Sequence, residues 1–300
     1  MEKRCLCIDV GGTAIKYALI DDARNLTDHG EVPTPTDNTE HYLEVLEGIC
    51  RQFDGQIRGV AMSVPGIIDS ENGICITAGW LHYANGLHLG EELTKRTGLP
   101  VSVMNDAKAA GLAEAAWGSL SDCKDSVVIL IGSGIGGALI KDGKVHFGRH
   151  GSAGEFSNIA LSENVDMPGS LWYAQNGTPR LVQMVSGAKG IPADQLNGRI
   201  LFEQANAGDP VVLAALDRFT RGIALQIFNL QMIYDPEKFA IGGGISRQKL
   251  FLESIQKNLD ELYTIYPEKS FPRAQLTTCR FFNEANLYGA YRFFTEREKA

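Results

Sequence analysis

Short apolar runs alternate with polar, glycine-containing turns along the chain, and this pattern predicts an α/β protein. The apolar run at residues 5–8 leads into a glycine turn and then into a second strand, so the chain is expected to begin with a β-hairpin. The same strand–turn–strand pattern occurs at residues 126–140. The repetition predicts a duplicated architecture of two lobes.

Helical spacing of apolar residues predicts helices at residues 40–53, 89–97, 108–117, 170–185, 199–206, 247–264 and 285–297. The longest helical run, residues 209–234, starts at Asp209-Pro210 and is apolar on nearly every side, which predicts a buried helix. Apolar runs that end in turn residues predict further strands at residues 57–64, 73–77, 100–104, 238–241 and 275–281.

Three glycine-rich turns follow predicted strands, and glycine lets the backbone approach a ligand closely because it has no Cβ. They are Gly11-Gly12-Thr13, Gly132-Ser133-Gly134 and Gly242-Gly243-Gly244. The first two could cradle phosphate oxygens with backbone N–H groups, and the third could let a flat ligand such as adenine-ribose lie against the chain. Glycine pairs between strands are also common hairpin turns, so the turns alone leave a purely structural role open.

Two further segments carry candidate site residues. Asn105-Asp106 stands between a predicted strand and a helix, where α/β proteins place site residues and where an ordinary helix N-cap also occurs. The loop at residues 78–86 has the aromatic and amide side chains that a sugar pocket uses. The alternative is a surface loop with one packed tryptophan.

Composition and charge narrow the possible classes of function. The chain has 300 residues, of which 44% are hydrophobic, which is typical of a globular protein with about two domains. Its net charge of −8 argues against nucleic-acid binding. No run of 18 apolar residues and no signal peptide occur, so we expect no membrane partner and a cytoplasmic protein. The 6 scattered cysteines predict neither disulfides nor a zinc site.

Six motifs together resemble the ROK family of sugar kinases and repressors, within the actin/hexokinase-like ATPase superfamily. In chain order they are DVGGT-x-x-K, S-x-PG, MNDA, GSGIGG, GEF and GGGIS, and they span nearly the whole sequence. The resemblance implies a two-lobed actin-like ATPase fold, related to ribonuclease H, with a mixed sheet and helices in each lobe and the active site in the cleft. The expected lobes are residues 1–118, with helix 285–300 packing back on them, and residues 119–284.

The resemblance also implies roles for these residues in the phosphorylation of a sugar hydroxyl by ATP. Asp106 would be the general base. ATP and Mg²⁺ would bind Asp9, Gly11, Gly12, Thr13, Lys16, Gly132, Ser133, Gly134, Gly242, Gly243 and Gly244, with Asp9 a possible partner of the metal. The sugar would bind Gly66, Asn85, Asn105, Asp106, Glu155 and Asn158. Family members are usually homodimers, and many repressors carry an N-terminal helix-turn-helix that we do not expect here.

The chain departs from the family pattern near the expected sugar site. Asn158 stands where most family kinases have a histidine that binds sugar and zinc, and Trp172 stands where a second sugar-binding glutamate is usual. Residues 160–170 contain no cysteine, so no structural zinc is expected. This pattern is similar to the β-glucoside kinase branch, which acts on the 6-hydroxyl of β-glucosides. The alternatives are an N-acetylmannosamine kinase, a glucokinase, a fructokinase, a sugar-sensing regulator without catalysis, or another ATPase of the superfamily.

Overall fold

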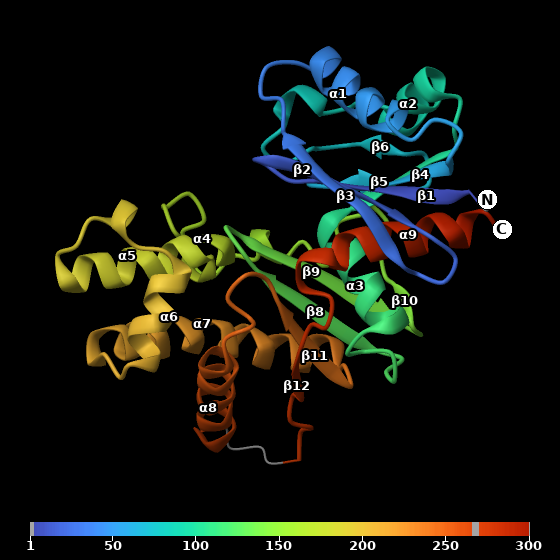
Figure 1. Ribbon diagram of the computed structural model, residues 1–300. Helices are drawn as coiled ribbons and strands as arrows, with labels where there is room; N and C mark the ends of the chain where they lie inside the picture. The colour runs from blue at the N-terminus through green and yellow to red at the C-terminus, as the bar shows by residue number, and fades with distance from the viewer. Residues whose placement is uncertain (1–2, 266–269, 300) are drawn as a thin grey trace. The chain divides into compact units, whose positions relative to one another are not determined.

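The computed structural model describes residues 3–265 and 270–299, and the chain divides into two compact units (Figure 1). Within the described residues, the first unit comprises the chain up to residue 116, residues 145–153 and the chain from residue 284 onward. The second unit comprises residues 117–144 and 154–283. The chain therefore returns to the first unit twice, once for a short segment and once for the last helix.

The first unit is built on a five-stranded mixed sheet in the order β3-β2-β1-β4-β7. Its strands are β1 (Arg4–Val10), β2 (Ala14–Ile20), β3 (Leu26–Pro33), β4 (Ile57–Val64) and β7 (Val101–Asn105). β1 pairs antiparallel with β2 and parallel with β4, and β4 pairs parallel with β7. A small ribbon of β5 (Ile68–Asp69) and β6 (Ile74–Cys75) lies outside this sheet.

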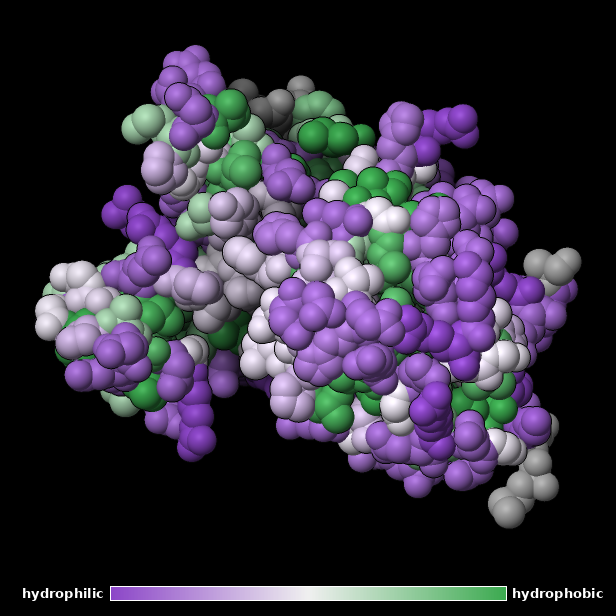
Figure 2. Space-filling model, turned by 90° about the horizontal axis from the view of Figure 1, so that it is seen from above, coloured by the Kyte–Doolittle hydropathy of each residue, from purple (hydrophilic) through white to green (hydrophobic). Residues whose placement is uncertain are grey.

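Helices cover both faces of this sheet (Figure 1). α1 (Thr39–Arg51) and α2 (Leu89–Thr97) pack on the face that carries Leu6, Ile8 and Val10. Because side chains alternate along a strand, Asp9 belongs to the opposite face, where α9 (Ala285–Arg297) packs on β1 and β4. α3 (Asp106–Trp117) follows β7 directly. Figure 2, seen from above, shows a mostly hydrophilic surface on the outer side of this unit.

The second unit repeats this architecture with the strand order β10-β9-β8-β11-β12. Its strands are β8 (Ser126–Ile131), β9 (Ile135–Lys141), β10 (Lys144–Val145), β11 (Lys238–Gly242) and β12 (Leu276–Thr278). β8 pairs antiparallel with β9 and parallel with β11, and β11 pairs parallel with β12. The predicted duplication is therefore confirmed in the topology of the two sheets.

The helices of the second unit correct two predictions. The helix expected at residues 170–185 is two helices, α4 (Trp172–Asn176) and α5 (Thr178–Lys189), because Gly177 is extended and Pro179 starts a new helix. α7 (Pro210–Tyr234) has the predicted bounds and packs against α8 (Lys249–Ile265), but it is not buried on all sides. Its residue Ile233 is 79% exposed, which shows that one face is open to solvent.

The remaining helices of the second unit are α6 (Gly198–Asn206) and the short 3-10 turns η2 (Phe156–Asn158) and η3 (Ala193–Gln195). Two further 3-10 turns in the described residues are η1 (His82–Ala84) and η4 (Phe282–Glu284). No helix in the described part of the chain is long and apolar enough to cross a membrane.

Candidate active site

The first glycine turn is a loop between β1 and β2 that hydrogen bonds hold in place. Gly11 N–H donates to the Ala14 carbonyl at 3.0 Å, and the Thr34 hydroxyl donates to the Gly11 carbonyl at 2.7 Å. The Thr34 N–H donates to the Thr13 carbonyl at 3.0 Å. Gly12 and Thr13 remain exposed, so the loop offers a fixed backbone and a hydroxyl to solvent. Thr34 was not predicted as a site residue, and nothing in its local sequence marks it.

Asp9 is the polar centre beside this turn. The Ser63 hydroxyl and the Asn286 amide donate to Asp9 Oδ1 at 2.8 and 2.9 Å, and Lys16 lies opposite Asp9 in the β1–β2 register. Burial raises the pKa of the Asp9 carboxyl, although the hydrogen bonds from Asn286 and Ser63 and the charge of Lys16 act in the opposite direction. Ser63 begins the S-x-PG motif, but its contact with Asp9 was not predicted, and the sequence did not point to Asn286.

The residues at this turn fit a magnesium ion. The Asp9 carboxylate and the Thr13 hydroxyl are hard oxygen donors, which Mg²⁺ prefers. Within the described ranges, no group of three or more His, Cys, Asp or Glu side chains could hold a metal ion. A magnesium ion here would therefore share its ligands with a bound phosphate, which is how Mg²⁺ is commonly held at nucleotide sites.

Asp106 is fixed at the start of α3. Its Oδ1 accepts hydrogen bonds from the Ala107 N–H at 2.7 Å and from the Asn105 amide at 3.0 Å. The same Asn105 amide donates to the Gly66 carbonyl at 2.8 Å, and its Oδ1 accepts from the Lys108 N–H at 3.0 Å. Asn105 thus caps α3 and ties Gly66 to Asp106. Both of its amide protons are used within the protein in this structure, so the Asn105 side chain holds Gly66 and Asp106.

The loop at residues 78–86 is closed by Asn85, whose Oδ1 accepts from the Ala78 N–H at 2.9 Å. Tyr83 is a packing residue, because its hydroxyl donates to the Pro35 carbonyl at 2.6 Å and its ring lies against Tyr42. Trp80 is 79% exposed, so the alternative of a loop with one packed tryptophan is wrong.

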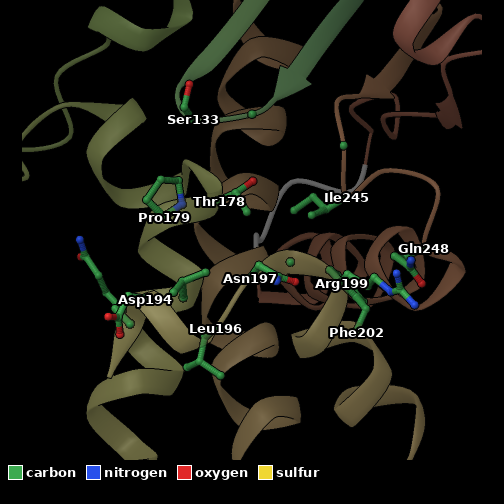
Figure 3. Close-up of a pocket in the computed structure, with 16 residues that line it drawn as sticks. Ser133, Thr178, Pro179, Asp194, Leu196, Asn197, Arg199, Phe202, Ile245 and Gln248 are labelled. Atoms are coloured by element: carbon green, nitrogen blue, oxygen red, sulfur yellow. The ribbon is translucent and has the colours of Figure 1, made fainter. Parts of the chain in front are cut away.

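The second unit contains a cavity of about 800 Å³ that joins the second and third glycine turns (Figure 3). It is lined by Gly132, Ser133, Thr178, Pro179, Val182, Gln183, Ala193, Asp194, Leu196, Asn197, Gly198, Arg199, Phe202, Gly244, Ile245 and Gln248. In Figure 3, Ser133 lies at one end of the cavity and the residues around α6 lie at the other. One residue or more of each of these two turns therefore borders the same cavity.

The glycines of these turns have different tasks. A Cβ on Gly242 would lie 2.5 Å from a Leu130 methyl group, and a Cβ on Gly243 would lie 2.1 Å from the Ile131 carbonyl oxygen. Both positions are packed against β8. A Cβ on Gly132 or Gly244 would meet nothing within 4 Å, and both residues line the cavity. Of the third turn, only Gly244 borders the cavity.

The second turn is held in place by its neighbours. The Thr178 N–H donates to the Gly132 carbonyl at 2.8 Å, and the Gly132 N–H donates to the Gly134 carbonyl at 3.0 Å. The Ser157 hydroxyl bonds both backbone groups of Ile135, at 3.1 and 2.8 Å. Gly134 is not among the cavity-lining residues. The contact of Ser157 with this turn was not predicted.

The departures from the family pattern have clear positions in the structure. Glu155 precedes η2, where Asn158 is exposed and its N–H donates to the Glu155 carbonyl at 3.1 Å. Trp172 is 0% exposed and packs on Phe156, with ring centroids 5.7 Å apart. Trp172 is therefore a core residue and does not replace a sugar contact.

Comparisons with known proteins give the same family as the motifs. The family model of the ROK family matches residues 5–297. The chain is 31% identical to a β-glucoside kinase of Klebsiella pneumoniae over 84% of this chain and 85% of that protein. It is 28% identical to an N-acetyl-D-glucosamine kinase of Vibrio cholerae, over 84% and 87% of the two chains.

Solved structures of similar proteins indicate the same family. A ROK family protein of Streptococcus pneumoniae in complex with sucrose is 30% identical, has a TM-score of 0.85 and matches 99% of this chain and 100% of its own. A ROK family glucokinase of Streptomyces griseus in complex with glucose and AMPPNP is 26% identical, with a TM-score of 0.80 over 96% and 97% of the two chains. The resemblance drawn from the six motifs is confirmed: this protein belongs to the ROK family and has its two-lobed, actin-like ATPase fold.

Proposed function

We propose that this protein is a kinase that transfers the γ-phosphoryl group of ATP to a sugar hydroxyl. The cavity of the second unit carries the proposal. Glycine turns with open backbone lie at Gly132 and Gly244, and apolar walls come from Val182, Leu196, Phe202 and Ile245. Open backbone suits a phosphate chain, and apolar walls suit a purine. The AMPPNP complex of the related glucokinase supports a nucleotide as the occupant.

The first unit supplies the acceptor side of the reaction in this proposal. The sugar hydroxyl oxygen attacks the γ-phosphorus, the bond from that phosphorus to the β–γ bridging oxygen breaks, and ADP leaves. Asp106 takes the proton of the hydroxyl as general base. The Ala107 N–H and the Asn105 amide hold its carboxylate in one orientation. Catalysis of this kind depends mainly on positioning and charge stabilisation.

The first glycine turn would hold the phosphates and their metal. Gly11, Gly12 and Thr13 present the backbone and a hydroxyl, and Lys16 adds a positive charge. Asp9 would bind the magnesium ion directly or through a water. When bound, Mg²⁺ neutralises phosphate charge and orients the transferred group.

The acceptor that we propose is the 6-hydroxyl of a β-glucoside. The 31% identical β-glucoside kinase and the sucrose complex of the 30% identical neighbour support a pocket that accepts a disaccharide. The sugar contacts that the family motifs suggest are Gly66 and Asn85 in the first unit and Glu155 and Asn158 in the second. An N-acetylated hexosamine is the second candidate, because one 28% identical relative is an N-acetyl-D-glucosamine kinase.

We infer that the protein works in the cytoplasm as a homodimer. All 6 cysteines are buried free thiols, which supports a reducing compartment. Leu225, Met232 and Ile233 leave apolar surface exposed on α7, which a second copy could cover. Size-exclusion chromatography with light scattering tests the dimer.

A coupled ADP-release assay tests the function. The panel comprises glucose, fructose, mannose, N-acetylmannosamine, N-acetylglucosamine, cellobiose, gentiobiose and arbutin. We expect turnover with the β-glucosides and a 6-phosphate product identified by NMR. A folded sample that binds ATP and turns over none of these sugars contradicts the proposal and favours a sugar-sensing regulator.

A further inference from the structure

Asp9 receives two hydrogen bonds on the same carboxylate oxygen from separate elements. Ser63, its register partner on β4, donates through its hydroxyl at 2.8 Å. Asn286, in the first turn of α9, donates through its amide at 2.9 Å. No hydrogen bond to Asp9 Oδ2 is found among the described residues. One oxygen is therefore held by the protein and the other is left for a ligand.

The position of Asn286 is fixed by tight packing of α9. A Cβ on Gly289, one turn further along α9, would lie 1.8 Å from the Ala109 carbonyl oxygen of α3. α9 also packs on β1, β2 and β4. The hydrogen bond from the Asn286 amide to Asp9 is therefore made from a rigid support.

We propose that Asn286 is a positioning residue for the phosphate site. Together with Ser63 it holds Asp9 Oδ1, so that Oδ2 is presented to the magnesium ion of the bound nucleotide. The last helix of the chain thereby contributes to the metal affinity of a turn near its beginning. This inference rests on the proposed function, because it needs a nucleotide-bound metal ion at Asp9.

The physical basis is that hydrogen bonds hold the Asp9 carboxylate in one orientation toward the metal ion. Hydrogen bonds to an ionised carboxylate are stronger than those between neutral groups. Groups that orient a metal ligand typically change metal affinity or activity by about 10- to 100-fold when they are removed. Asn286 and Ser63 share one oxygen, so removal of either leaves the other in place, and we expect an effect at the lower end of this range.

Mn²⁺ binding measured by electron paramagnetic resonance tests the inference without turnover. The protein is loaded with AMPPNP in the absence of sugar, and Mn²⁺ replaces Mg²⁺ as the probe. We expect Asn286→Ala and Ser63→Ala each to weaken Mn²⁺ binding about tenfold, with AMPPNP affinity in EDTA unchanged. Asn25→Ala is the matched control, because Asn25 donates to Asp21 Oδ2 at 2.9 Å elsewhere in the same unit. It should bind Mn²⁺ like the wild type.

A double-mutant cycle with Asp9→Asn separates positioning from general loss of structure. If Asn286 acts through Asp9, then Asn286→Ala causes no further loss in the Asp9→Asn background. The inference is overturned if Asn286→Ala lowers Mn²⁺ affinity equally in the wild-type and Asp9→Asn backgrounds. It is also overturned if the Mn²⁺ affinity of Asn286→Ala stays within twofold of the wild type. Asn286→Leu, which fills nearly the same volume, replaces Asn286→Ala if that variant does not fold. Wild-type-like Mn²⁺ binding by Asp9→Asn also overturns it. Absence of sugar turnover in a wild-type protein that binds Mn²⁺ and AMPPNP contradicts only the proposed function.

Discussion

Gly66 and Gly243 occupy equivalent places in the two sheets, just after β4 and β11, the strands that pair in parallel with β1 and β8. Both have a φ of +97°. A Cβ on Gly66 would lie 2.2 Å from the Thr77 carbonyl oxygen, and a Cβ on Gly243 would lie 2.1 Å from that of Ile131. The duplicated topology thus repeats a backbone turn that only glycine fits.

Gly243→Ala is expected to destabilise the protein by about 3 kcal/mol, because the new methyl group meets a backbone carbonyl in a left-handed region. Gly208 provides the matched control: its φ is +85°, but a Cβ there would meet nothing within 4 Å. Gly208→Ala should therefore cost only about 1 kcal/mol. Urea unfolding measures the free energy of unfolding of both variants. Equal losses of this free energy would show that the contact with Ile131 is unimportant.

Gly244→Val is expected to fold normally and to bind nucleotide poorly. Gly244 lines the cavity and has an ordinary φ, and a Cβ there would meet no atom within 4 Å, so the new side chain occupies empty space. We expect the KM for ATP to rise about tenfold, equivalent to about 1.4 kcal/mol, with the KM for sugar unchanged. Steady-state kinetics at saturating concentrations of the second substrate measure this.

The control for this variant is Gly187, which also has open space around a Cβ but does not line the cavity. Gly187→Val should leave the KM for ATP unchanged. An unchanged KM for ATP in Gly244→Val would mean that the cavity is not the nucleotide site.

Asp9→Asn is expected to stabilise the metal-free protein while it removes activity. Burial raises the pKa of Asp9 above its ordinary value of 3.8, so the folded state binds this proton more tightly than the unfolded chain does. The stability that comes from this proton is present at low pH and is lost as the pH rises through the folded pKa. An asparagine carries no charge and can still accept from Ser63 and Asn286.

At pH 8 we therefore expect Asp9→Asn to unfold with a free energy about 1 kcal/mol higher than that of the wild type. The difference should shrink as the pH falls through the folded pKa of Asp9. Urea unfolding in EDTA over a pH series from pH 8 into the acid range measures this, with the exposed Asp166→Asn as control. If Asp9→Asn is less stable than the wild type at pH 8, the raised pKa of Asp9 is contradicted. The same holds if its stability relative to the wild type increases toward acid pH.

The sequence located the glycine turns and the order of elements, because both depend on local residue choice. The sequence could not show which glycine of a turn packs against a strand and which one lines a cavity. Gly242 and Gly243 are needed for packing on β8, whereas Gly244 borders the cavity, and this division depends on which strand lies behind the turn. Likewise, Ser63 and Asn286 reach Asp9 only because β4 and α9 pack beside β1.

At two places, tertiary packing decided what local composition could not. α7 is apolar on most sides, yet Ile233 is 79% exposed, since the neighbouring helices, chiefly α5 and α8, cover only part of α7. The amide protons of Asn105 go to Gly66 and Asp106, whereas its contact with sugar stays a prediction. A hydrogen-bond partner that lies far away in the sequence leaves no local pattern, so the capping and positioning role of Asn105 needed the structure.

Asp106→Asn is expected to lower kcat by about 10²- to 10⁴-fold and to leave sugar affinity nearly unchanged. The amide oxygen of an asparagine can accept the same hydrogen bonds from Ala107 and Asn105, so the geometry at the start of α3 is retained. The amide cannot take the proton of the attacking hydroxyl, so only the chemical step is affected. Single-turnover phosphorylation and calorimetric sugar binding separate the two effects. The exposed Asp54→Asn should behave like the wild type in both. If Asp106→Asn loses sugar binding and kcat in parallel, Asp106 is a binding residue and another group must accept the proton.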